Sequence, residues 1–279
     1  MDYQPIFTRR NNDLFESGYH WPYSTSIAPL PIQRKIAGIL SAYDDLIENN
    51  ARRIKVLEEM ARTLYREWFV EFRAPKVKLR KATPEEKKVM GKDVFPVAWN
   101  VGRLDDALLL QRGFDLPNKQ RRDGNFPIYA ATGIVGTHDE AKVKGPGVVT
   151  GRSGSLGTVI YVEEDYWPLN TSLWVKEFRR VTPLYAYYLL SDLELGQFNS
   201  GAAVPTLNRN DIHGLPIVIP GHGVLDRFDN YVLPLYALRR NLQERNTVLR
   251  RTRDLLLSRL VSGEVDVSEL DIALPEEAV

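Results

Sequence analysis

Basic and amide side chains gather in one short stretch, "LLLQRGFDLPNKQRRDG", near the middle of the chain. Cationic side chains this close together neutralise phosphate groups, and the amides between them add hydrogen-bond donors. The stretch therefore predicts a phosphate-contacting loop, although a solvated surface loop has the same composition. The predicted phosphate contacts are Arg112, Lys119, Arg121 and Arg122.

Two further stretches, "VTGRSGSLGTVIY" and "FNSGAAVPTLNRNDIHGLPI", combine glycine with short polar side chains. Glycine lets the backbone approach a partner closely, and Arg, Asn, Ser and Thr match the hydrogen-bonding groups on base edges. These stretches predict base reading, with structural roles expected for several members, Asn170 and Thr206 especially. The candidates are Arg152, Ser153, Ser155, Asn170, Asn199, Thr206, Asn208 and Arg209.

Patterns typical of catalysis do not emerge from the sequence. The segment "GPGVVTGRS" has the wrong spacing for a nucleotide-binding loop and places Arg152 where Lys is required. The four histidines show no metal-ligand spacing, and the paired acids are sequence neighbours that point in different directions. The chain has no cysteine, which excludes thiolate catalysis, disulfides and cysteine-based zinc sites. We expect no catalytic residue and no metal site.

The composition fits a protein of one or two domains with a sizeable core. Among its 279 residues no stretch approaches the roughly 18 apolar residues of a membrane span, and no signal peptide is visible. The formal net charge of +1 is uninformative by itself, because nucleic-acid binding needs only local basic patches. We expect a cytoplasmic protein.

Two long helices are predicted to position these polar stretches. Shifting Val56 onto Val248 superposes two apolar seams that advance in alternating steps of four and three, the heptad signature of a coiled coil. The alternative is a pair of unrelated amphipathic helices on a core, and Pro234 is expected to kink or restart the second helix. The first seam is Ile36, Leu40, Tyr43, Ile47, Asn50, Ile54, Leu57, Ala61, Leu64 and Trp68; the second is Phe228, Val232, Leu235, Arg239, Leu242, Asn246, Leu249, Arg253, Leu256 and Leu260.

The phase of the seams predicts how the helices pair. The two helices flank the central segment, so the chain runs out along the first and back along the second, and their pairing should be antiparallel. If the ten positions of each seam are numbered in chain order, the fifth position of the first seam should face the sixth position of the second. Asn50 should then meet Asn246 across the seam, and Arg253 should lie within reach of Asp44. The alternative places both asparagines at the edge of the seam, facing water.

The segment between the helices has short β-type runs separated by Gly, Pro, Asn and Asp, and one helix beginning at Thr182 and Pro183 and stopping at Gly196. The predicted fold is α+β: one mixed, mainly β domain flanked by two long helices in an antiparallel coiled coil. The expected organisation is an N-terminal tail (1–29), a long helix (30–73), a charged linker or extended arm (74–98), the mainly β domain (99–220), a second long helix (221–262) and a C-terminal tail (263–279).

The chain resembles the specificity subunits of type I restriction-modification systems. The helical segments "LPIQRKIAGILSAYDDLIENN" and "RDLLLSRLVSGEVDV" are similar to that family's conserved helical regions. The stretches "FPIYAATGIVGTHDEA", "VVTGRSGSLGTVIYV", "YWPLNTSLWV" and "SGAAVPTLNRNDIHGLPIVIP" look like its target recognition domain. The similarity runs from about Leu30 to Val267.

This resemblance implies a non-catalytic subunit that reads half of a split site in double-stranded DNA and docks methyltransferase subunits, and through them restriction subunits. Its helices would set the spacing between two recognition domains, and S-adenosylmethionine, ATP and Mg would belong to the partner subunits. The sequence departs from the family pattern of domain, helix, domain, helix, because it has a single recognition domain. We therefore expect a half-size form, natural or truncated, completed by a second copy or a complementary half-subunit.

Two other classes stay open on the residues alone. A coiled-coil interaction protein, with a central domain that binds a protein or glycan, predicts no salt-dependent affinity for duplex DNA. An enzyme with an unrecognised site predicts turnover by the isolated chain.

Overall fold

The computed structural model describes residues 28–201 and 203–272. They fall into two compact units: the described parts of Met1–Val56 and Leu238–Val279 form one, and Leu57–Ala237 forms the other. The elements in chain order are α1 (Leu30–Tyr65), the π-helix η1 (Arg66–Val70), β1 (Leu79–Lys81), α2 (Pro84–Met90), β2 (Val94–Pro96), β3 (Asn100–Arg103), α3 (Leu104–Ala107), β4 (Leu108–Arg112), the 3-10 helix η2 (Asn118–Gln120), β5 (Phe126–Ala130), β6 (Gly133–His138), β7 (Gly147–Gly151), β8 (Val159–Val162), β9 (Trp167–Pro168), β10 (Ser172–Phe178), α4 (Pro183–Asp192), the 3-10 helix η3 (Leu195–Phe198), α5 (Arg209–His213), β11 (Pro216–Ile219) and α6 (His222–Val261).

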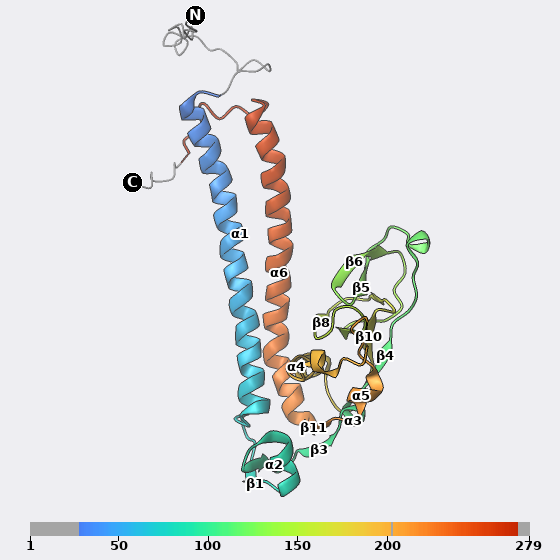
Figure 1. Ribbon diagram of the computed structural model, residues 1–279. Coiled ribbons are helices and arrows are strands. Elements are labelled where there is room, and N and C mark those ends of the chain that lie inside the picture. Colours follow the sequence, from blue (N-terminus) through green and yellow to red (C-terminus); the bar gives the residue numbers. More distant parts are fainter. Residues whose placement is uncertain (1–27, 202, 273–279) are drawn as a thin grey trace, which may run out of the picture. The chain divides into compact units, whose positions relative to one another are not determined.

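The helical unit is an antiparallel coiled coil of α1 and α6 (Figure 1). Asn50 Nδ2 donates to Asn246 Oδ1 at 2.9 Å, and Asn246 Nδ2 donates to the Ile47 carbonyl at 3.1 Å. Asp44 accepts a hydrogen bond from Arg253. Residues that come earlier in α1 thus contact residues that come later in α6. The antiparallel register predicted from the heptads is therefore confirmed, and so is the asparagine contact.

Near the start of α1 and the end of α6, the buried side chains of Ile36 and Leu260 pack together. Val267, with only 1% of its surface exposed, belongs to the same cluster. Lys35 Nζ donates to the Ser268 carbonyl at 2.6 Å. Residues 263–272, expected to be part of a tail, therefore fold back onto α1 as far as they are described. Residues 1–27 and 273–279 of the two expected tails lie outside the described residues.

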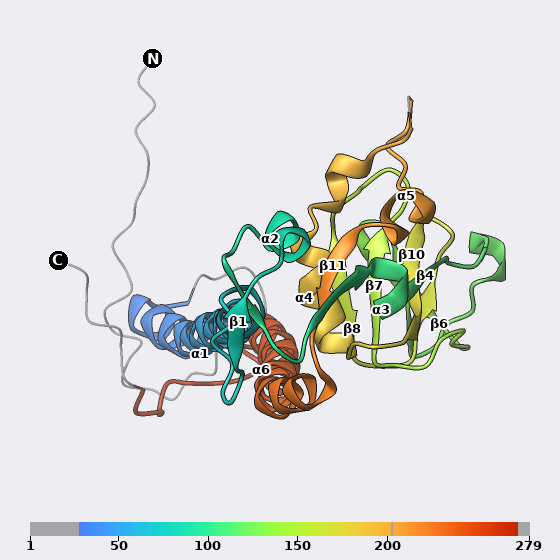
Figure 2. The ribbon, with the colours of Figure 1, turned by 90° about the horizontal axis from the view of Figure 1, so that it is seen from below.

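The second unit is built around a four-stranded sheet with strand order β4-β10-β7-β8, accompanied by a three-stranded sheet β6-β5-β9 and the pair β11-β3 (Figure 2). The strands of the four-stranded sheet are all antiparallel, and β4 and β8 are its edges. All five residues of β7, "GVVTG", are buried, as the continuous β-type run requires. The mixed, mainly β domain is thus observed as predicted.

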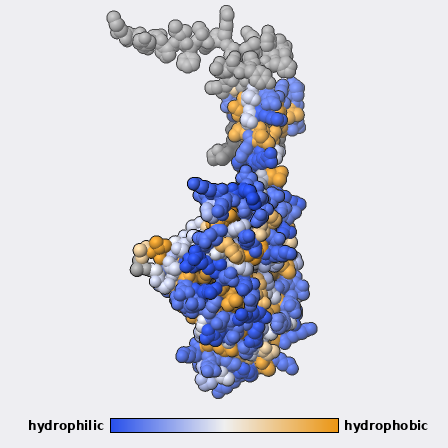
Figure 3. All heavy atoms as spheres, turned by 90° about the vertical axis from the view of Figure 1, so that its right-hand side faces the viewer, coloured by the Kyte–Doolittle hydropathy of each residue, from blue (hydrophilic) through white to orange (hydrophobic). Residues whose placement is uncertain are grey.

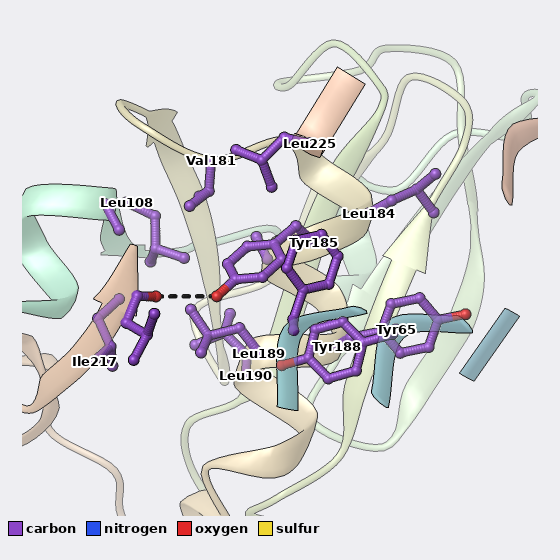
Figure 4. Packing of buried hydrophobic residues seen from close by; sticks show 14 of the residues in the cluster. Tyr65, Leu108, Val181, Leu184, Tyr185, Tyr188, Leu189, Leu190, Ile217 and Leu225 are labelled. Carbon is purple, nitrogen blue, oxygen red and sulfur yellow. Dashed lines mark hydrogen bonds between the residues drawn. The ribbon is translucent and has the colours of Figure 1, made fainter. Parts of the chain in front are cut away.

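Helix α4 supplies the core residues that pack on this sheet. Thr182 accepts from the Tyr185 N–H as the N-cap, and Pro183 occupies the first turn, as expected. Tyr185 is buried and donates its hydroxyl proton to the Val218 carbonyl at 3.0 Å (Figure 4). Tyr65, from the end of α1, stacks on Tyr188 with ring centroids 5.0 Å apart. The helix ends at Asp192, earlier than the predicted stop at Gly196, which lies in η3.

Helix α6 runs through Pro234 without interruption, contrary to the expected restart. Proline removes one backbone hydrogen bond and crowds the preceding turn. On either side of it, Val232 is fully buried and Tyr236 is 4% exposed in the core. Burial of these neighbours holds the helix in place despite the missing bond.

The segment 74–98, predicted to be a charged linker or extended arm, is instead folded. It contains β1, α2 and β2, and β1 pairs with β2 in antiparallel register. The fully buried Phe95 contacts Phe72, with ring centroids 5.9 Å apart, and Ala74 is buried as well. The sequence pattern did not reveal this fold, because charged residues dominate the segment. Its few buried apolar residues form a core only by packing against residues outside the segment. We call it the β1–α2–β2 unit.

Candidate nucleic-acid interface

Two of the predicted base-reading stretches form one surface. Loop A comprises residues 151–157, which begin at the last residue of β7, and loop B comprises residues 199–201 and 203–208, before α5. The Gly154 N–H donates to the Pro205 carbonyl at 2.9 Å, and the Leu207 N–H donates to the Arg152 carbonyl at 2.8 Å. Ser153 and Thr206 form an antiparallel bridge between these bonds. Polar residues about fifty positions apart in sequence are therefore neighbours on a backbone ladder.

Glycine is required where loop A turns. A Cβ atom on Gly151 would lie 1.9 Å from the Ser155 carbonyl oxygen, closer than any non-bonded contact allows. Gly154 and Gly157 have φ angles of +89° and +86°, which side chains rarely adopt. The glycines seen in the sequence thus serve to fold the loop so that Ser153 and Ser155 are presented on it.

The hydroxyl groups of Ser153 and Ser155 make no hydrogen bond with any described residue, and both residues are partly exposed. Arg152 is partly buried, and its Nη1 lies 3.4 Å from the Asn170 carbonyl, a weak interaction that leaves most of its donors free. Loop A therefore presents a guanidinium and two hydroxyl groups, which suit hydrogen bonding to base edges or phosphate.

Loop B uses its polar groups mainly on itself. Asn199 Oδ1 accepts from the N–H groups of Gly201 and Thr206, at 3.0 and 2.9 Å. The Thr206 hydroxyl donates to the Val204 carbonyl at 3.0 Å. Thr206 therefore has the structural role expected for it, and Asn199 keeps only its amide donors for a partner.

Asn170 also has a structural partner, because its side-chain amide donates to the carboxylate of Asp115. This bond ties the turn after β9 to the segment after β4, where the Asn170 N–H donates to the Phe114 carbonyl at 3.0 Å. The structural role expected for Asn170 is thus observed.

Helix α5 is fixed against the edge strand β4 by two side chains. Arg209 Nη1 lies 3.4 Å from the Leu110 carbonyl, and the Leu110 N–H donates to His213 Nε2 at 3.1 Å. Burial lowers the pKa of His213, which keeps the ring neutral and its Nε2 able to accept. Asn208 caps the helix by accepting from the Asn210 N–H. Asn208 and Arg209, predicted base readers, therefore both position α5, and His213 is a positioning residue that no sequence pattern revealed.

The four predicted phosphate contacts separate into two kinds. Arg112 and Lys119 are exposed and form no ion pair with a described residue. Arg122 is neutralised by Asp139, with Nε and Oδ2 2.7 Å apart, and by Glu140. Arg121 is partly buried, with Nε 3.5 Å from the Leu116 carbonyl. Of the four, Arg112 and Lys119 are thus the exposed cations whose charge no described carboxylate compensates.

An exposed apolar pair lies in β6, shortly after the β5–β6 turn. Ile134 and Val135 of β6 are 61% and 42% exposed, and they stand between Gly133 and Gly136, which both have positive φ angles. The tip of this hairpin approaches loop A, since a Cβ on Gly151 would lie 3.2 Å from the Ala131 carbonyl. The side of the molecule drawn in Figure 3 is largely hydrophilic, with apolar residues scattered over it. The short sequence "GIVG" was the only local signal for this pair.

Comparison with known families assigns this domain. Residues 96–232, which contain loop A, loop B and the sheet beneath them, match the type I restriction modification DNA specificity domain. Residues 96–232 thus form a type I restriction modification DNA specificity domain.

Among proteins similar to this chain is the type I restriction enzyme MjaIX specificity subunit of Methanocaldococcus jannaschii. It is 28% identical over 275 residues, an alignment that covers 85% of this chain and 60% of the relative. A crystal structure of the S subunit from M. genitalium has the same fold, with a TM-score of 0.61 at 19% identity, over 83% of this chain and 61% of that one. The chain thus spans about three fifths of the length of both.

Among the described residues of this chain, no helix is long and apolar enough to cross a membrane. Within the same residues, no group of three or more His, Cys, Asp or Glu side chains is arranged to hold a metal ion.

Proposed function

We propose that this chain selects the DNA sequence for a type I restriction-modification complex, reading one half of a bipartite site in duplex DNA. The observation that carries the proposal is the ladder between loop A and loop B. It brings together Arg152 and the hydroxyl groups of Ser153 and Ser155, which form no hydrogen bond with a described residue, on a DNA specificity domain. Side chains of these types discriminate bases by hydrogen bonds in the major groove.

Arg112 and Lys119 would contact the phosphate backbone beside that surface. Contacts of this kind set the position of the protein on the duplex and supply affinity that falls with salt, without sequence preference. Arg122 would contribute only after exchanging Asp139 and Glu140 for phosphate, so its contribution should be smaller.

The coiled coil would dock methyltransferase subunits, and restriction subunits through them. Large apolar side chains remain exposed on it, including Leu46 (55%), Val248 (64%) and Leu255 (56%). A coiled coil that buries its own seam leaves such residues exposed at a cost in water, which a partner surface would remove. Methylation and cleavage, with S-adenosylmethionine, ATP and Mg, would then belong to the partner subunits in the cytoplasm.

The described residues contain one specificity domain, so a split site requires a second reading surface in the assembly. A second copy of the chain would supply it by two-fold symmetry and would recognise an inverted repeat. A complementary half-subunit would instead give two unrelated half-sites. The spacing between the half-sites would be set by the helices.

The test is to purify the chain with candidate methyltransferase subunits, expose the complex to a random DNA library and sequence the modified bases. We expect a split motif, and its symmetry distinguishes a second copy from a complementary half-subunit. Modification of a contiguous, unsplit motif by a complex with a single copy would refute the bipartite assembly. Absence of salt-dependent duplex binding would instead favour a coiled-coil protein whose central domain binds a protein or glycan.

A further inference from the structure

The β1–α2–β2 unit carries an unusual concentration of positive charge. Its residues 76–93 contain seven basic and three acidic side chains, a net charge of +4, whereas the whole chain has a net charge of +1. The basic residues are Lys76, Lys78, Arg80, Lys81, Lys87, Lys88 and Lys92, and the acidic residues are Glu85, Glu86 and Asp93.

Two of the three acidic side chains form ion pairs with basic side chains of the same unit. Glu86 lies 2.6 Å from Arg80, whose hydrogen bond holds the pKa of Glu86 well below its usual range. Asp93 pairs with Lys87 at 2.5 Å. Glu85 is the acid left over.

Four lysines remain exposed and form no ion pair with a described residue: Lys76, Lys78, Lys81 and Lys88. Lys92 is not among them, because it pairs with Glu71 at 2.6 Å. Four free ammonium groups against one free carboxylate leave a surface that repels other cations and attracts anions.

The backbone that carries these lysines is fixed. Lys81 faces Val94 in the β1–β2 register, and the Val97 N–H donates to the Lys78 carbonyl at 2.9 Å. Thr83 and Glu86 form a reciprocal capping box at the start of α2. Lysines on such a frame need to order only their own side chains on binding.

The spacing of the lysines indicates the partner. They emerge from β1, from the segment before it and from α2, so they suit a repeating array of negative charges better than a single small anion. Ammonium groups are compact point charges that contact phosphate without strict geometry, as sequence-independent binding requires. The unit belongs to the same compact body as loops A and B.

We propose that the β1–α2–β2 unit is a second DNA-contacting surface, which binds backbone phosphates outside the sequence read by loops A and B. The inference rests on the proposed function and adds a footprint outside the matched domain, which begins at residue 96. In this arrangement the β1–α2–β2 unit would supply affinity for the duplex, and loops A and B would supply sequence specificity.

The test replaces Lys76, Lys78, Lys81 and Lys88 together by Gln in the complete complex. Binding to duplexes carrying the selected motif, with long or minimal flanks, is measured between about 50 and 200 mM salt. We expect the salt slope on long duplexes to fall by about 0.9 for each phosphate that is no longer neutralised, and the affinity at low salt to fall on the order of tenfold or more. On duplexes with minimal flanks the variant should match the wild type, and its motif should be unchanged.

Two control variants accompany this test. The fourfold Lys→Arg variant keeps the charge and should bind as the wild type does. Lys55→Gln removes an exposed lysine of α1 and should leave the slope unchanged. If the fourfold Gln variant keeps the wild-type slope and affinity while the wild type selects a motif, the present inference is wrong and the proposed function stands. If the wild type shows no salt-dependent duplex binding, both are wrong.

Discussion

The contact between Asn50 and Asn246 can be tested quantitatively. Asn246 is 3% exposed, and its side-chain oxygen accepts from Asn50 Nδ2 at 2.9 Å. Asn50→Ala leaves that buried oxygen without a donor, which should cost about 1–3 kcal/mol in unfolding free energy. Asn246→Ala removes the same bond and the one to the Ile47 carbonyl, and it frees the partly exposed Asn50 amide to bind water. We expect a decrease of about 1–2 kcal/mol for it.

The double-Ala variant should be destabilised by less than the sum of the two single variants, because the shared bond can be removed only once. The coupling should be about 1 kcal/mol, the usual net worth of such a bond. The assay is urea unfolding followed by helical circular dichroism. Asn49→Ala, which truncates the exposed neighbouring asparagine, is the matched control and should change the free energy by less than about 0.5 kcal/mol.

Replacing both asparagines by Leu distinguishes stability from register. The double-Leu variant fills the seam with apolar side chains, so its unfolding free energy should equal or exceed that of the wild type. Its register should be less strictly defined, because the polar pair no longer penalises slipped pairings. The chain has no natural cysteine, so an Ile36→Cys, Leu260→Cys pair reports register by disulfide formation. Additive effects of the two single-Ala substitutions would refute the inferred hydrogen bond.

Three further predictions concern the second unit. Ser153→Ala and Ser155→Ala should each relax one position of the selected motif and cost about 1–3 kcal/mol of discrimination, measured by library selection; an unchanged motif in both would exclude loop A from base reading. Gly151→Ala should weaken specific binding and lower the melting temperature, because its Cβ would meet the Ser155 carbonyl at 1.9 Å. The control is Gly223→Ala, where the same atom meets nothing within 4 Å and φ is not positive, and it should leave specific binding intact. Burial raises the pKa of Asp229 to about 6, so the folded state binds a proton more tightly than the unfolded state, and the free energy of unfolding should fall as pH rises from about 4 to about 6. Asp229→Asn should flatten that change and raise the free energy of unfolding at pH 7 by about 1 kcal/mol, after allowance for the partial exposure of the side chain. The measurement is urea unfolding at several pH values.

The coiled coil and its register could be predicted from the sequence alone. Heptad phase depends only on helical periodicity, and the reversal of the chain between the two seams favours the pairing in which the two asparagines meet. The mainly β character of the middle, and the cap of α4 at Thr182, likewise followed from local patterns. The heptad pattern of each helix, the β-type runs and the cap are encoded by residues close together in the chain, and the register follows from matching two such local patterns.

Which polar residues remain free to bind a partner depends instead on the tertiary structure. Arg122 and Arg112 were equivalent candidates in the sequence, but folding brings Asp139 and Glu140 to the first and not to the second. In the folded chain the side chains of Arg209 and His213 also lie against the backbone of Leu110. The charged segment 74–98 is folded because Phe95 packs against Phe72. The reason is that electrostatic and packing partners are chosen by distance in space, which a linear sequence specifies only through the complete fold.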